Sequence, residues 1–158
     1  MEIYENKLDA LAILNNLKND NLLLTLIFIE VNIITPYIMI TGEIMQLQYS
    51  ELENNIRLIK LSGKLDIVGV GEIETKFAGY CAGDKVRVVV DLSEVDFLAS
   101  IGIRLLTLTA KSVASRGGRM ALMNPIPEVQ RVLEIAGVPS IIPVYSHFES
   151  AETVLLAS

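Results

Sequence analysis

The stretch VRVVVDLSEVDFLASIGI, residues 86–103, decides the fold. Its first part, residues 86–90, is a β-branched run with a single charge, which is typical of a strand buried on both faces. We expect this strand to end at Asp91, a polar loop to follow, Phe97-Leu98 to return to the core, and a helix to begin at Ser100. A buried strand that leads into a helix is the unit from which α/β sheets are built.

Further elements follow on both sides of this stretch. Upstream, alternation and turn residues predict strands over residues 46–50 and 56–61, and an apolar stripe at spacings of three and four predicts a helix over residues 68–80. Downstream we expect a helix over 100–115, a strand over 120–123, a helix from Pro127 to Gly137, a strand over 141–145 and a helix over 148–157. The resulting order, ββαβαβαβα, predicts an α/β fold in which helices pack against a sheet.

Residues 1–45 differ in composition from the rest, so we expect an atypical N-terminal extension followed by one domain over residues 46–158. Leucines recur at every third position from Leu8 to Leu17, which indicates a short amphipathic helix. An apolar run at residues 22–29 follows, but Glu30 and Pro36 interrupt the only window long enough for a membrane helix, so we expect no stable membrane insertion. The segment is open to two interpretations, an extra strand or packing arm, or a leader that precedes a native start at Met45.

The composition and charge of the chain argue against several classes of function. The net charge of −6 and the absence of a basic run argue against nucleic-acid binding. Cys81 is the only cysteine, which favours a reduced, cytoplasmic compartment, and His147 is the only histidine, so we expect neither a metal site nor a cofactor. No paired carboxylates, nucleophile–base pair or phosphate-binding glycine loop can be recognised, and we therefore predict that the protein is not an enzyme.

The chemistry of the chain centres on Ser100, which we expect at the start of a helix. A serine at the N-cap accepts a hydrogen bond from an orphan backbone N–H, so a purely structural role is open. The alternative is that the hydroxyl accepts a phosphate, which adds about −1.5 to −2 charges at pH 7. A helix N-terminus tolerates such a charge, whereas a partner that covers it would have to desolvate it.

The segment from Val88 to Leu106, read with Gly63-Lys64-Leu65-Asp66 upstream, resembles the STAS domain of bacterial anti-sigma factor antagonists. Residues 118–122 and 129–137 also resemble the later strand and helix of that family, and the resemblance spans about residues 46–157. It implies a STAS-like α/β fold with a central mixed β-sheet.

The resemblance also implies a mechanism. In that family the serine at the Ser100 position is phosphorylated by a serine protein kinase of the histidine-kinase-like ATPase fold, which is also the anti-sigma factor. The unphosphorylated antagonist sequesters this kinase and releases a sigma factor, and a serine phosphatase resets the switch. Asp66 matches a loop position near the serine. Ala99 stands where many members carry an acidic residue, and Ile101 where many carry Ser or Thr, so Ser100 is the only hydroxyl there.

The helix after Ser100 supplies a possible partner surface. Helical geometry puts Ile101, Leu105 and Leu108 on a face opposite the one suited to packing on the sheet. This stripe is either exposed for docking or covered by a neighbouring helix or by residues 22–29. The predicted partner-binding residues are Asp66, Ala99, Ile101, Gly102, Leu105 and Leu108. The competing function is a scaffold or assembly subunit of the same fold, in a signalling or transport complex, whose serine is not phosphorylated.

Overall fold

The structure, a computed structural model, describes residues 44–157. The predicted N-terminal extension lies outside the described residues except for its last two, and one of these, Met45, is buried in the core of the domain. The observed elements are β1 (Gln46–Glu51), the 3-10 turn η2 (Glu53–Asn55), β2 (Ile56–Leu65), α4 (Ile67–Tyr80), β3 (Arg87–Leu98), α5 (Ser100–Ser115), β4 (Arg119–Met123), α6 (Pro127–Ile135), the 3-10 turn η3 (Val138–Ser140), β5 (Val144–Tyr145) and α7 (Phe148–Leu156). The predicted order ββαβαβαβα is confirmed.

The five strands form one sheet in the order β1-β2-β3-β4-β5. The hairpin strand β1 is antiparallel to β2, while β2, β3, β4 and β5 are parallel to one another. The sheet is therefore mixed, as expected. Because the parallel strands end at a common edge, the segments that lead into α4, α5 and α6 all begin there. We call this the carboxyl edge of the sheet.

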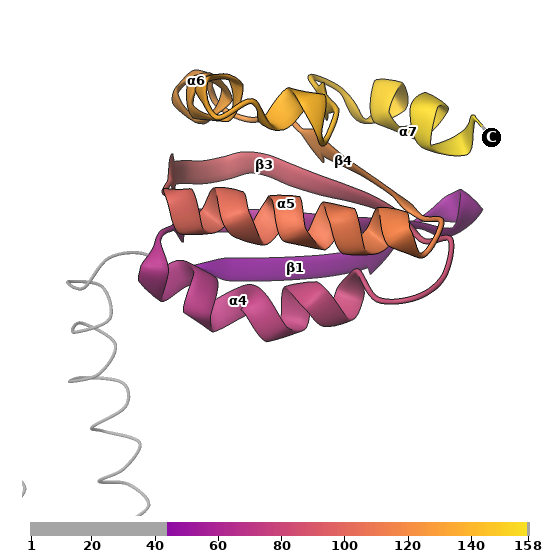
Figure 1. Ribbon diagram of the computed structural model, residues 1–158, viewed down its shortest axis with the longest axis horizontal. Helices are drawn as coiled ribbons and strands as arrows, with labels where there is room; N and C mark the ends of the chain where they lie inside the picture. Colours follow the sequence, from indigo (N-terminus) through magenta and orange to yellow (C-terminus); the bar gives the residue numbers. More distant parts are fainter. Residues whose placement is uncertain (1–43, 158) are drawn as a thin grey trace, which may run out of the picture. The chain divides into compact units, whose positions relative to one another are not determined.

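Helices cover both faces of the sheet. Alternate residues of β3 point to opposite faces, so Val88 and Val90 lie in one core cluster with α4, α5 and α6, while Val89 lies in a second cluster with α7. The predicted stripe of α4 is confirmed, since Val70, Ile73 and Phe77 are all buried. Figure 1 shows α4 and α5 running side by side along the sheet.

The strand β3 is longer than the sequence pattern predicts. It continues past Asp91 to Leu98, so the expected polar loop is in fact strand. The pairing of β3 with β2 contains two register shifts, in each of which β3 has one extra residue. The first lies between Lys60 and Ser62, and the second follows Gly63. Because of these shifts, the sequence of β3 does not show a regular alternation of buried and exposed residues. Such bulges break the two-residue period, and buried side chains recur at Leu92, Val95 and Leu98 instead.

The caps predicted from glycine and proline are confirmed, but the last strand is shorter than expected. Pro127 begins α6, and Gly117 and Gly137 adopt positive φ angles of 73° and 70° after their helices. The predicted strand over 141–145 is reduced to Val144–Tyr145, because Ile142 turns back and donates its N–H to the carbonyl of Val138.

Candidate functional site at the carboxyl edge

Ser100 is the first residue of α5 and is exposed to solvent. The N-cap is Ala99, which has extended φ and ψ angles and no side-chain cap bond, so the alternative in which Ser100 caps the helix is not observed. The reason is the length of β3, which runs to Leu98 and leaves a single residue before the helix. Ala99 is held by its N–H, which donates to the carbonyl of Leu65 over 3.1 Å. Within residues 44–157 the Ser100 hydroxyl therefore has no capping role to compete with modification.

Asp66 is the N-cap of α4 and lies at the same edge. Its Oδ1 accepts the N–H of Val68 over 3.0 Å and the N–H of Gly69 over 2.9 Å. Leu65, which precedes it, is paired with Leu98 in the parallel register of β2 and β3. The structure thus brings Asp66 and Ser100 together at adjacent strand ends, and gives the Asp66 carboxylate a structural role that the sequence did not reveal.

Two glycines allow the first turns of α4 and α5 to pack closely against the end of β2. A Cβ on Gly102 would lie 2.8 Å from both the carbonyl oxygen and the Cβ of Leu65, and a Cβ on Gly69 would lie 1.9 Å from the carbonyl oxygen of Lys64. Gly102 is accordingly buried. Gly102, predicted as a partner-binding residue, is thus packed against Leu65 and Leu98 on the inner side of α5.

The predicted apolar stripe of α5 is only partly exposed. Leu105 is 7% exposed, and Ile101 is half-buried and packs against the main core. Leu108, in contrast, is 53% exposed. The neighbouring helix α4 covers Leu105, which decides between the two alternatives for this residue: Leu105 belongs to the helix–helix contact and is not a free docking side chain.

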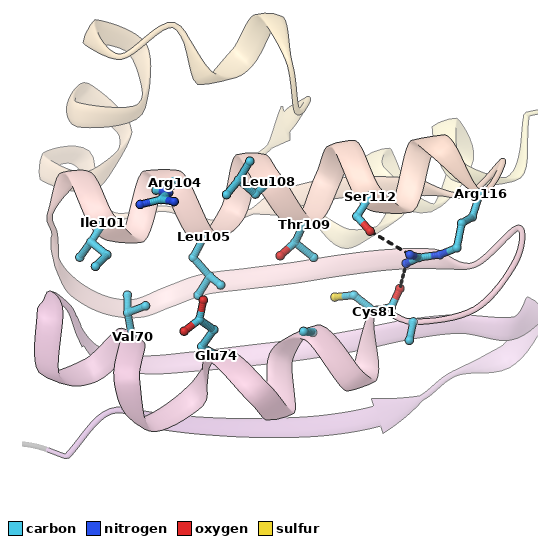
Figure 2. Close-up of a pocket in the computed structure, with 12 residues that line it drawn as sticks. Val70, Glu74, Cys81, Ile101, Arg104, Leu105, Leu108, Thr109, Ser112 and Arg116 are labelled. Carbon is cyan, nitrogen blue, oxygen red and sulfur yellow. Dashed lines mark hydrogen bonds between the residues drawn. The ribbon is translucent and has the colours of Figure 1, made fainter.

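A groove of about 570 Å³ runs between α4 and α5. Figure 2 shows Val70 and Glu74 of α4 facing Ile101 and Leu105 of α5. Near its far end, burial raises the pKa of the Cys81 thiol to about 12. The end of α4 is secured there by Arg116, which donates hydrogen bonds to the carbonyls of Cys81 and Gly83, and by Arg57, which donates to those of Tyr80 and Ala82.

Sequence reasoning missed three exposed apolar side chains at the carboxyl edge. Ile67 is 74% exposed, Val68 is 65% exposed and Phe97 is 50% exposed. We call Ile67, Val68 and Phe97 the edge patch. Phe97 was expected in the core, but the second bulge of β3 turns it outward and only Leu98 is buried. The exposure of Val68 could have been predicted from helical geometry, since Val68 lies about 200° around the helix from the buried Val70.

Among the residues that the structure describes, only Lys60 and Glu94 form an ion pair, with 2.5 Å between Nζ and Oε1. Their hydrogen bond lowers the pKa of Glu94 and raises that of Lys60.

In residues 44–157 no group of three His, Cys, Asp or Glu side chains could hold a metal ion. No helix in that range is long and apolar enough to cross a bilayer. His147 is exposed just before α7.

Comparison with known proteins agrees with this architecture. Residues 50–151 match the STAS domain family. The match spans more than half of the chain, and the protein therefore belongs to the STAS domain family. The resemblance seen in the sequence is thereby confirmed.

Among sequence relatives, BtrV of Bordetella bronchiseptica, whose name includes the words anti-sigma factor antagonist, is 33% identical over 91 residues, which are 58% of this chain and 78% of BtrV. The anti-sigma F factor antagonist of Paenibacillus polymyxa is 28% identical over 110 residues, 66% of this chain and 91% of the relative.

Solved structures share the fold. An anti-sigma factor antagonist from Mycobacterium paratuberculosis superposes with a TM-score of 0.62 at 23% identity, over 70% of this chain and 93% of that one. The antagonist SpoIIAA in its unphosphorylated form gives a TM-score of 0.58 at 23% identity, over 69% of this chain and 96% of SpoIIAA. At this level of identity the similarity establishes the fold alone.

Proposed function

We propose that this protein is an anti-sigma factor antagonist controlled by phosphorylation of Ser100. In its unphosphorylated form it binds a serine kinase of the histidine-kinase-like ATPase fold that also acts as an anti-sigma factor, and the bound kinase releases its sigma factor. The kinase transfers the terminal phosphoryl group of ATP to the Ser100 hydroxyl, ADP and the hydroxyl proton leave, and the complex dissociates. A serine phosphatase hydrolyses the phosphate and restores binding.

Sequence relatives support the general role, because several are named as anti-sigma factor antagonists. Phosphorylation has a precedent in the same fold, since SpoIIAA has been solved in a phosphorylated as well as an unphosphorylated form. The single observation that carries the proposal for this chain is the exposed Ser100 side chain at the first position of α5, where no cap bond occupies it.

The physical basis of the switch is the cost of covering a phosphate. In the free protein the N–H groups and dipole of α5 favour a negative group at Ser100 by about 0.3–1 kcal/mol, so modification should leave the fold intact. In a complex the partner surface would remove water from the phosphate, and an unpaired buried charge costs several kcal/mol. A penalty of about 4 kcal/mol would weaken binding roughly a thousandfold, which is enough to operate a switch.

The edge patch offers the apolar area that docking requires. Ile67 and Val68 follow the Asp66 cap, and Phe97 precedes Ser100 by three residues, so the three side chains lie on the two segments that carry the candidate switch. Protein interfaces combine such an apolar centre with a polar rim. We therefore assign the kinase contact to the edge patch together with Asp66, Ala99, Ile101 and the exposed Leu108. We assign Gly102 and Leu105, which are buried, a positioning role.

The test is phosphorylation and binding with the serine kinases encoded in the same genome. Ser100→Ala should abolish phosphate incorporation and retain kinase binding, and Ser100→Asp should weaken binding at least tenfold. Ser115→Ala, at an exposed serine of the same helix, is the matched control and should behave as the parent protein. Phosphate mapped by mass spectrometry to another residue, or binding unaffected by Ser100→Asp and by phosphorylation, would support the scaffold function instead.

A further inference from the structure

We propose that β1 is a dimerisation surface, which pairs antiparallel with β1 of a second copy of this chain and joins the two sheets edge to edge. β1 forms one edge of the sheet, and among residues 44–157 no further strand pairs with its outer side. Ser100 follows β3, which is separated from β1 by β2, so this inference goes beyond the proposed function and does not depend on it.

β1 lacks the features that protect edge strands from pairing. Proteins commonly shorten such strands, interrupt them with a bulge or place lysine or proline on them. β1 has six residues, QLQYSE, contains neither lysine nor proline, and pairs with β2 without a register shift. All of its residues except Leu47 are exposed. The outer N–H and C=O groups of β1 are therefore available to another strand, whereas the opposite edge, β5, is only two residues long.

One face of β1 is apolar and is held in place by α4. Leu47 packs against the main core, and Tyr49 lies on the same face because alternate residues of a strand point to the same side. The ring of Tyr49 stacks on that of Tyr80 in α4, with the ring centroids 4.3 Å apart and the planes at 7°. Both tyrosines are still 36% exposed, so this face has apolar area that a second strand would cover.

The sequence of β1 is complementary to itself in one register. In a two-fold antiparallel pair, directly opposed residues point to the same face, so the central residue opposes its own copy. With Gln48 at the centre, Leu47 opposes Tyr49 of the second copy and Gln46 opposes Ser50. Apolar residues then meet on the face covered by α4, and polar residues meet on the other face. Centring the pair on Tyr49 would instead place Leu47 against the charged Glu51.

The register centred on Gln48 also keeps like charges apart. Glu51 is the only charged residue of β1 and lies at its end. In this register it opposes the apolar Met45 of the second copy, and the two Glu51 residues are six positions apart along the seam, which is about 20 Å. This separation is more than twice the Debye length of about 8 Å at physiological ionic strength. The charge on β1 therefore does not oppose pairing with a second copy.

The experiment is sedimentation equilibrium of the full chain over a range of concentrations. A pair of six-residue strands buries less than the roughly 1,200–2,000 Å² of a standard interface, so we expect a reversible dimer with a dissociation constant of about 10–100 µM. Gln48→Lys places two like charges directly opposite each other and should weaken the dimer at least tenfold. Ser50→Lys is the matched control, because its lysine meets the neutral Gln46, and should change the dissociation constant by less than about threefold.

Cross-linking tests the register independently of affinity. Gln48→Cys places two thiols directly opposite each other, within reach of a disulfide, whereas the two thiols of Ser50→Cys would lie about 14 Å apart. With copper phenanthroline as oxidant, Gln48→Cys should form covalent dimers much faster than Ser50→Cys. The parent protein, whose Cys81 is buried, gives the background rate.

Three results would contradict the proposed dimer. A full chain that stays monomeric at every concentration overturns it. A dimer that Gln48→Lys leaves intact has its interface elsewhere, provided that the variant unfolds at nearly the parent temperature, as the exposure of Gln48 leads us to expect. Slow amide hydrogen exchange along β1 in a monomeric protein would mean that another part of the same chain covers this edge.

Discussion

At the scale of single residues, Cys81 illustrates how burial sets chemistry. The thiol follows α4 directly and is 1% exposed. Burial raises its pKa to about 12 from an ordinary value of 9.0, and the nearby charges of Arg57 and Arg116 offset only part of that rise. The reactive form of cysteine is the thiolate, so a buried thiol with this pKa is inert at neutral pH.

We predict that iodoacetamide at pH 8 leaves folded Cys81 unmodified and alkylates it only in denaturant. Because the unfolded thiol loses its proton near pH 9 and the folded thiol keeps it to about 12, the unfolded state binds fewer protons in this range and stability falls as the pH rises. Denaturant titrations of the parent and of Cys81→Ala between pH 8 and 11 measure this, and the variant should lose stability less steeply. Stoichiometric labelling of the folded protein would contradict the prediction.

At the scale of elements, the seating of α5 on β2 depends on the absence of a side chain. Gly102 is buried against the Cβ and carbonyl of Leu65 and the side chain of Leu98. Gly71 in α4 offers a contrast, because nothing lies within 4 Å of the position its Cβ would occupy. Both glycines lie within helices, so intrinsic helix propensity favours alanine at either position.

We predict opposite effects on stability for these two glycines. Gly102→Ala should destabilise the domain by about 1–3 kcal/mol, because the backbone at the start of α5 must shift to remove the overlap. Gly71→Ala should stabilise it by about 0.5–1 kcal/mol, through the smaller entropy cost of ordering alanine. Urea unfolding followed by circular dichroism measures both values. Equal effects of the two substitutions would mean that α5 does not pack closely against Leu65 of β2 at Gly102.

At the scale of the whole molecule, exposed apolar side chains lie at more than one place. The edge patch adjoins Ser100, whereas Ile135, which is 80% exposed, is the last residue of α6. Ile135 lies on a different helix from the two segments that carry the edge patch and Ser100. The proposed function requires the edge patch for kinase binding and does not require Ile135.

We predict that Ile67→Glu weakens kinase binding at least tenfold, because a carboxylate replaces apolar area at the centre of the docking surface. Ile135→Glu makes the same chemical change at a more exposed isoleucine and should leave binding within about twofold. Both should unfold at nearly the parent temperature, since neither side chain is in the core. Calorimetry with the purified kinase measures the affinities, and a larger effect from Ile135→Glu would move the docking surface away from Ser100.

Local patterns were sufficient for the order of the elements and for several boundaries. The helix over 100–115 is confirmed in full, as are the start of α6 at Pro127 and the left-handed glycines that follow α5 and α6. These features depend on the periodicity of apolar residues, on the missing N–H of proline and on the ability of glycine to adopt a positive φ angle. All three are properties of residues close together in the sequence. The identity of Ser100 as the hydroxyl at the start of α5 belongs to the same group.

Other features were decided only by tertiary structure. The strand β3 extends to Leu98 because β2 pairs with it through two bulges, and that pairing turns Phe97 outward and makes Ala99 the N-cap. Leu105 is buried because α4 lies against it, although its position on the helix is that of a free stripe. The sequence by itself determined which elements form and where the serine stands. Which side chains surround that serine depended on which element covers which, because burial is a property of partners distant in the chain.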